Sequence, residues 1–142
     1  MKIFEDIREV GHFTMTSGRT SNYFYNFDRL FPYQVTLYAE QLVDAYLLYQ
    51  KNIPCVITPA YGGVPLAFAI ANLLRVPLLT LTKEGIMRGR TEYIHDGYLI
   101  VDDVISTYGA IKNIQRHIDP KYKPYGAAAF IFRGKEEKMK TM

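Results

Sequence analysis

Two adjacent aspartates, Asp102 and Asp103, follow an apolar stretch at residues 98–101 and precede two hydroxyl residues, Ser106 and Thr107. Neighbouring carboxylates can accept hydrogen bonds from the vicinal hydroxyls of a ribose. Small and hydroxyl residues before a helix are typical of an anion site, because the first amides of a helix point outward without partners. A sugar phosphate has both a diol and a phosphate. The alternative is a set of residues that only caps the next helix, but the length of the whole pattern favours the ligand.

The elements that must position these residues alternate along the chain. Buried apolar strands that alternate with helices are typical of a parallel sheet covered on both faces, and ligands bind such sheets at the carboxyl ends of the strands. We therefore predict an α/β fold with a Rossmann-like central parallel sheet flanked by helices. The expected strands are 22–27, 55–58, 76–81, 98–101 and 126–132; the expected helices are 1–10, 33–50, 64–74 and 110–118; residues 13–18 and 102–109 are expected to be irregular.

Composition narrows the classes of protein. The chain has 142 residues, 49% apolar and 22% charged, which suits one domain at residues 1–134 and a solvated tail at 135–142. The single cysteine, Cys55, is expected to be a buried small hydrophobe and excludes an intrachain disulfide or a cysteine zinc site. The three histidines make no metal pattern. A net charge of +3 without clustering argues against nucleic-acid binding. No apolar stretch is long enough for a membrane-spanning helix. The N-terminal segment contains acidic residues and is therefore unlike a signal peptide. We expect a cytoplasmic protein.

The segment at residues 98–110 resembles the phosphoribosyl-diphosphate signature of type I phosphoribosyltransferases. Other segments, in the same order along the chain, resemble orotate phosphoribosyltransferases in particular. These are residues 13–27 with Ser-Gly-Arg-Thr-Ser-Asn-Tyr-Phe, 58–67 with Thr-Pro-Ala-Tyr-Gly-Gly-Val-Pro-Leu-Ala, 81–84 with Leu-Thr-Lys-Glu, and 132–136 with Phe-Arg-Gly-Lys-Glu. The resemblance implies the type I fold with a small N-terminal hood that helps to cover the base.

The resemblance also implies an activity and a set of residue roles. The enzyme would transfer ribose 5-phosphate from phosphoribosyl diphosphate to orotate, with Mg²⁺ bound mainly through the diphosphate, and would work as a homodimer on small-molecule substrates. Asp102 and Asp103 would hold the ribose diol and stabilise the cationic sugar of the transition state. The phosphate loop would be Ser106, Thr107, Tyr108, Gly109 and Ala110, and the diphosphate would meet Tyr61 and Gly62. The loop cations would be Lys83 and Arg88, and the base would contact Ser17, Gly18, Arg19, Phe24, Tyr25 and Arg133.

The chain departs from the family pattern at positions that face anions. Thr16, Gly62 and Ile86 stand where the family usually has lysine, and Tyr108 stands where it keeps glycine. The family's mobile loop, here residues 83–97, is also several residues shorter. Because stabilisation of a leaving diphosphate is largely electrostatic, these departures keep two alternatives open: a catalytically weak or inactive protein that binds a nucleotide or a protein partner, and a transferase for another base.

Overall fold

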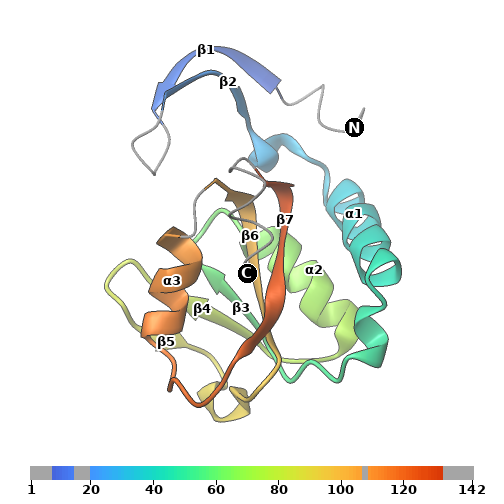
Figure 1. Cartoon of the computed structure of the whole chain (residues 1–142). Helices are drawn as coiled ribbons and strands as arrows, with labels where there is room; N and C mark the ends of the chain where they lie inside the picture. Colours follow the sequence, from blue (N-terminus) through green and yellow to red (C-terminus); the bar gives the residue numbers. More distant parts are fainter. Residues whose placement is uncertain (1–7, 15–19, 107–108, 133–142) are drawn as a thin grey trace.

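The computed structural model describes residues 8–14, 20–106 and 109–132; for residues 8–14 and 20–25 it describes the backbone. Figure 1 shows the path of the chain. The strands are β1 (Arg8–Thr14), β2 (Thr20–Tyr25), β3 (Val56–Pro59), β4 (Leu78–Leu81), β5 (Met87–Arg88), β6 (Tyr98–Ile105) and β7 (Pro124–Phe132). The helices are α1 (Pro32–Ala45), α2 (Val64–Leu74) and α3 (Gly109–Arg116), with short 3-10 turns η2 (Phe27–Arg29), η3 (Leu48–Gln50) and η4 (Thr91–Tyr93).

The central sheet has the order β5-β4-β3-β6-β7. Strands β4, β3, β6 and β7 are parallel, so the predicted α/β fold is confirmed. The prediction of an all-parallel sheet needs one correction, because β5 runs antiparallel to β4. The turn that joins β4 to β5 is too short for a crossover helix, and a short connection between neighbouring strands forces the antiparallel direction.

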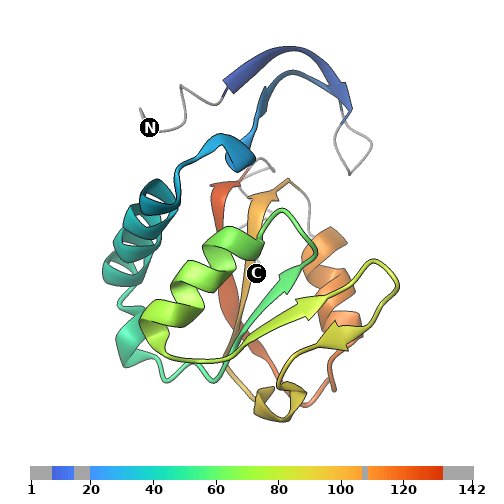
Figure 2. The same cartoon turned by 180° about the vertical axis from the view of Figure 1, so that it is seen from behind.

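Helices cover both faces of this sheet. Helices α1 and α2 pack on one face and α3 on the other (Figures 1 and 2). Strand β6 shows why both faces are apolar: Leu99 and Val101 pack with α1 and α2, whereas Ile100 between them packs with Ile111 and Ile114 of α3, as the two-residue period of a strand requires. The predicted burial of Cys55 is also confirmed.

The N-terminal prediction was wrong in part. Residues 1–7 of the expected helix 1–10 lie outside the described residues, but its end is strand, because β1 begins at Arg8 and pairs antiparallel with β2. The expected irregular segment 13–18 likewise begins within β1. Apolar residues at helical spacing cannot reveal a partner strand farther along the chain. The hairpin of β1 and β2 forms the hood, and it arches beyond the carboxyl ends of β6 and β7 (Figure 1).

Two other boundaries also differ from the predictions. Helix α1 ends at Ala45, not at residue 50; Leu47 takes a left-handed conformation with φ of 51°, and the turn that follows buries Leu48. Strand β6 continues to Ile105, so the segment expected to be a loop from residue 102 is strand up to that point. The extension is held by pairing with β7, where Asp102 lies opposite Ala129. No helix in the described part of the chain is long and apolar enough to cross a membrane.

Candidate active site

The two aspartates lie at the carboxyl end of β6, next to the centre of the sheet. Asp102 Oδ1 accepts a hydrogen bond from the amide of Asp103 at 2.8 Å, and Asp103 Oδ1 accepts one from the amide of Val104 at 2.8 Å. Both residues are half-buried. The amide that follows each carboxylate therefore orients it, and the pair is held in place before any ligand binds.

The environment of Asp102 disfavours its charge. Burial, followed by the hydrogen bond and the negative charge of the Asp103 side chain, raises the pKa of Asp102 to about 8. Like charges that share a site cannot both ionise at low cost. Asp102 therefore keeps a proton near neutral pH, and the pair can donate as well as accept hydrogen bonds.

The loop after β3 lies directly against the acid pair. The amide of Ala60 donates to the carbonyl of Leu81 at 2.9 Å, which ties this loop to β4, and the Ala60–Tyr61 peptide is cis. A Cβ on Gly62 would lie 2.5 Å from Asp103 Oδ2, and one on Gly63 would lie 2.7 Å from Asp102 Cα. The two glycines thus allow the loop backbone to approach the carboxylates.

The structure brings together four of the residues that the sequence assigned to the diphosphate and the ribose: Tyr61, Gly62, Asp102 and Asp103. Tyr61 is 73% exposed, so its ring is open to solvent beside the loop. A fifth residue was not singled out from the sequence. Thr58 is fully buried at the end of β3, and its Oγ1 lies 2.6 Å from the position of a Cβ on Gly63. The only indication in the sequence was the position of Thr58 at the start of the segment 58–67, which contains Gly62 and Gly63.

The predicted phosphate loop is described only in part. Ser106 follows the last residue of β6 and is half-buried, and α3 begins at Gly109, one residue before the predicted start. Ala110 is exposed in the first turn of α3. Thr107 and Tyr108 lie outside the described residues. A strand that ends in acids therefore leads into a helix N-terminus, as the pattern predicted.

The two predicted loop cations lie in a compact hairpin. Residues 82–86 close on themselves: the amide of Thr82 donates to the carbonyl of Ile86 at 2.9 Å, and the amide of Ile86 donates to Thr82 Oγ1 at 3.1 Å. Lys83 is exposed in this turn and Arg88 is exposed on β5. The segment 83–97 is therefore not one open loop, because it contains β5 and η4. Within the described part of the chain, neither cation forms an ion pair with the aspartates.

Most of the predicted base-binding residues fall outside the described residues: Ser17, Gly18, Arg19 and Arg133. Phe24 and Tyr25 lie on β2, of which the backbone is described. Strand β7 ends at Phe132, immediately before Arg133. The hood and the end of β7 thus lie at the same end of the sheet as the acid pair (Figure 1).

Solved structures define the class of fold. The orotate phosphoribosyltransferase of Aeropyrum pernix superposes with a TM-score of 0.76 and 22% identity over 96% of this chain and 83% of that one. The adenine phosphoribosyl transferase of Trypanosoma brucei, solved with AMP, pyrophosphate and ribose-5-phosphate, gives a TM-score of 0.68 and 19% identity over 90% and 65%. The chain has the type I phosphoribosyltransferase fold.

Sequence likeness narrows the class. The orotate phosphoribosyltransferase of Thermus thermophilus is 34% identical over 113 residues, which are 75% of this chain and 61% of that protein. The sequence is therefore similar to those of orotate phosphoribosyltransferases, and the chain is shorter than these relatives. It spans 61–63% of the length of the curated relatives that it matches. No family model matches the chain.

Proposed function

We propose that this protein transfers ribose 5-phosphate from phosphoribosyl diphosphate to orotate. A ring nitrogen of orotate would form a bond to C1 of the ribose and lose its proton, while the bond from C1 to the diphosphate breaks and the diphosphate leaves with the electron pair. One observation carries the proposal: the acid pair at the end of β6 lies against the Gly62–Gly63 backbone. This arrangement suits a ligand that has a diol beside an anionic leaving group.

In this proposal, Asp102 and Asp103 bind the ribose hydroxyls. A sugar that loses diphosphate gains positive charge, and carboxylates nearby stabilise that charge in the transition state. The loop at Tyr61 and Gly62 offers backbone to the diphosphate. Ser106, Thr107, Tyr108, Gly109 and Ala110 surround the 5-phosphate at the start of α3.

The base and the leaving group would meet the remaining residues. Lys83 and Arg88 would supply positive charge to the diphosphate. The base would lie between the hood and the end of β7, in contact with the set named from the sequence: Ser17, Gly18, Arg19, Phe24, Tyr25 and Arg133.

The donor set fits Mg²⁺ held mainly by substrate oxygens. The described residues contain no group of three or more His, Cys, Asp or Glu side chains placed to hold a metal. Mg²⁺ typically binds one or two carboxylates together with substrate phosphates and water. Asp103 would provide one carboxylate, and Asp102 would provide a second when it loses its proton. The ion would supply positive charge beside the diphosphate.

We further propose that the protein is a cytoplasmic homodimer. Exposed large side chains on α1 and α2 support the dimer, since Tyr33 and Phe68 are 63% and 64% exposed and Leu37 is 48% exposed. Exposed aromatic side chains of this kind are enriched at protein interfaces.

The alternative is a member of the fold that binds a nucleotide and turns over slowly or not at all. The compact turn at residues 82–86 favours it, because a cation held away from the acid pair contributes little to the departure of diphosphate. A transferase for another base also stays open, since an adenine enzyme shares the fold.

The deciding experiment is a titration of the protein with phosphoribosyl diphosphate and Mg²⁺ by calorimetry, followed by addition of orotate with its ultraviolet absorbance as readout. Binding with loss of orotate supports the transferase. Binding without loss of orotate, including in the presence of fresh Mg²⁺, favours the nucleotide-binding alternative or another base. Absence of binding refutes the phosphoribosyl diphosphate site itself.

A further inference from the structure

Three aromatic residues from three elements form one cluster, hereafter the aromatic cluster: Phe27 of η2, Tyr38 of α1 and Phe130 of β7. The rings of Phe27 and Phe130 stack with centroids 4.6 Å apart and planes 12° apart. The ring of Tyr38 lies 5.1 Å from that of Phe130. Phe130 is thus the shared member, and it joins the middle of α1 and the segment before that helix to the last third of β7.

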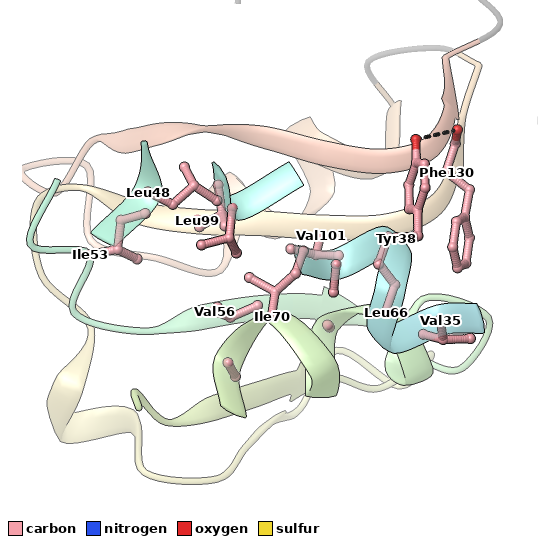
Figure 3. Packing of buried hydrophobic residues seen from close by; sticks show 14 of the residues in the cluster. Val35, Tyr38, Leu48, Ile53, Val56, Leu66, Ile70, Leu99, Val101 and Phe130 are labelled. Carbon is pink, nitrogen blue, oxygen red and sulfur yellow. Dashed lines mark hydrogen bonds between the residues drawn. The ribbon is translucent and has the colours of Figure 1, made fainter. Parts of the chain in front are cut away.

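Tyr38 also binds the backbone of β7. Its hydroxyl donates to the carbonyl of Phe130 at 3.1 Å, and the carbonyl of Ala129 lies at 3.5 Å (Figure 3). β7 is an edge strand of the central sheet, so its outer carbonyls need donors from outside the sheet. Burial raises the pKa of Tyr38, and the phenol therefore remains protonated and able to donate.

Apolar burial alone does not explain this arrangement. The rest of the same core cluster is mainly aliphatic, as at Val35, Leu66 and Ile70, and aliphatic side chains would also fill the space. A stacked ring pair and a directed hydrogen bond restrict orientation as well as volume. The aromatic cluster therefore fixes how β7 lies against α1 and η2.

The cluster lies at the root of both segments that the proposed function assigns to the base. Phe27 is two residues after Tyr25, the last residue of the hood, and Phe130 is three residues before Arg133. We infer that the aromatic cluster positions the hood and the end of β7 relative to each other, and that Phe27, Tyr38 and Phe130 are positioning residues for base affinity. This inference rests on the proposed function, because that function assigns the two segments to the base.

The first test compares Tyr38→Phe and Phe27→Leu with a matched control, Tyr98→Phe. Tyr98 is also buried but lies at the amino end of β6, in the core of the opposite face. Loss of one oriented hydrogen bond or ring stack is expected to raise KM for orotate about fivefold in each cluster variant. KM for phosphoribosyl diphosphate should stay within about twofold, because its proposed contacts lie on β6 and the Gly62 loop, whereas the substituted residues lie on α1 and η2 and contact β7. Equal changes in both KM values, or the same change in Tyr98→Phe, would overturn the inference.

The second test needs no turnover. Amide hydrogen exchange should quicken in β2 when Tyr38→Phe is introduced, although Tyr38 lies on another element, and should stay unchanged in Tyr98→Phe. If the wild type neither binds nor consumes orotate, the proposed function fails, and the exchange result alone decides the inference. Faster exchange in β2 then supports positioning of the hood by the cluster, whereas unchanged exchange in β2 shows that the cluster is only core packing.

Discussion

The loop after β3 and the turn after β4 leave neighbouring parallel strands at the same edge of the sheet, yet they have different partners. The loop lies against the acid pair, with Gly62 and Gly63 in close approach to the carboxylates. The turn instead lies beside the residue that follows α3, because a Cβ on Gly85 would be 3.0 Å from His117 Nε2. Neighbouring parallel strands twist relative to one another. The turn after β4 is one strand farther from β6 than the loop after β3, so the twist can direct it away from the carboxyl end of β6. Order along the sequence therefore predicts the edge of the sheet but not the contacts made there.

The largest effect is expected at the acid pair. Asp103→Asn keeps the shape of the side chain but removes its charge, so we expect turnover to fall at least about a hundredfold while the melting temperature changes little. Steady-state assays and thermal unfolding measure the two quantities. The control is Asp119→Asn, an exposed acid that pairs with Lys121 at 3.7 Å. Unchanged turnover in Asp103→Asn would exclude the ribose role.

The next largest effect is expected when a glycine is replaced by alanine, either in the loop after β3 or in the turn after β4. A Cβ on Gly63 would lie 2.6 Å from Thr58 Oγ1 and 2.7 Å from the backbone of Asp102, so Gly63→Ala should lower the free energy of unfolding by about 1–3 kcal/mol and weaken phosphoribosyl diphosphate binding. Gly85→Ala should lower it by about 1 kcal/mol, because its φ is +86°. The affinity of Gly85→Ala for phosphoribosyl diphosphate should not change. Urea titration and calorimetry separate the two variants, and an equal loss of affinity in Gly85→Ala would place the turn in the site.

Because Asp102 holds a proton, we predict that the free energy of unfolding depends on pH. Its pKa is about 8 in the folded chain and 3.8 in the reference state, so between these values the folded protein holds a proton that the unfolded chain releases. The contribution of Asp102 to the free energy of unfolding is fully present below pH 3.8 and is lost as pH rises through about 8. Asp102→Asn cannot ionise, so its stability relative to wild type should increase with pH by about 2 kcal/mol or more between pH ~5 and ~8.5. Urea titrations that give parallel curves for the two proteins would contradict the proton assignment.

The sequence was sufficient where local pattern and burial agree. Apolar stretches between turn residues predicted β3 and β4 to within two residues, and α2 matches its predicted bounds at Val64–Leu74. The acid pair was also placed at the correct strand. Its own strand was predicted too short, because a pair of aspartates is typical of a loop, while pairing with Ala129 holds them in β6. Nothing local to residues 102–105 indicates that partner.

Specific contacts between residues that are not adjacent in the sequence decide the regions that the sequence could not predict. Strand β1 depends on β2, and the β4–β5 turn depends on the hydroxyl of Thr82, which accepts the amide of Ile86. In the sequence, Thr82 stands out only as part of the Leu-Thr-Lys-Glu segment at residues 81–84. In the structure it is 8% exposed and holds the turn closed, a role that follows from its neighbours and not from its charge.

The smallest effect is expected at Lys83, and it bears directly on the contrast between the two regions. Lys83 is exposed in a turn that lies beside His117, so its charge would act on a bound diphosphate through solvent. Lys83→Gln should then weaken phosphoribosyl diphosphate binding about threefold at low salt, and the loss should disappear near ~0.3 M salt, where screening shortens the reach of exposed charges. The control is Lys121→Gln, which removes an exposed lysine paired with Asp119. A tenfold or larger loss that persists in salt would mean that the turn leaves His117 and closes on the ligand, because only a direct charge-assisted contact resists screening. No loss at any salt concentration would remove Lys83 from the site and leave the loop after β3 as the diphosphate-facing region.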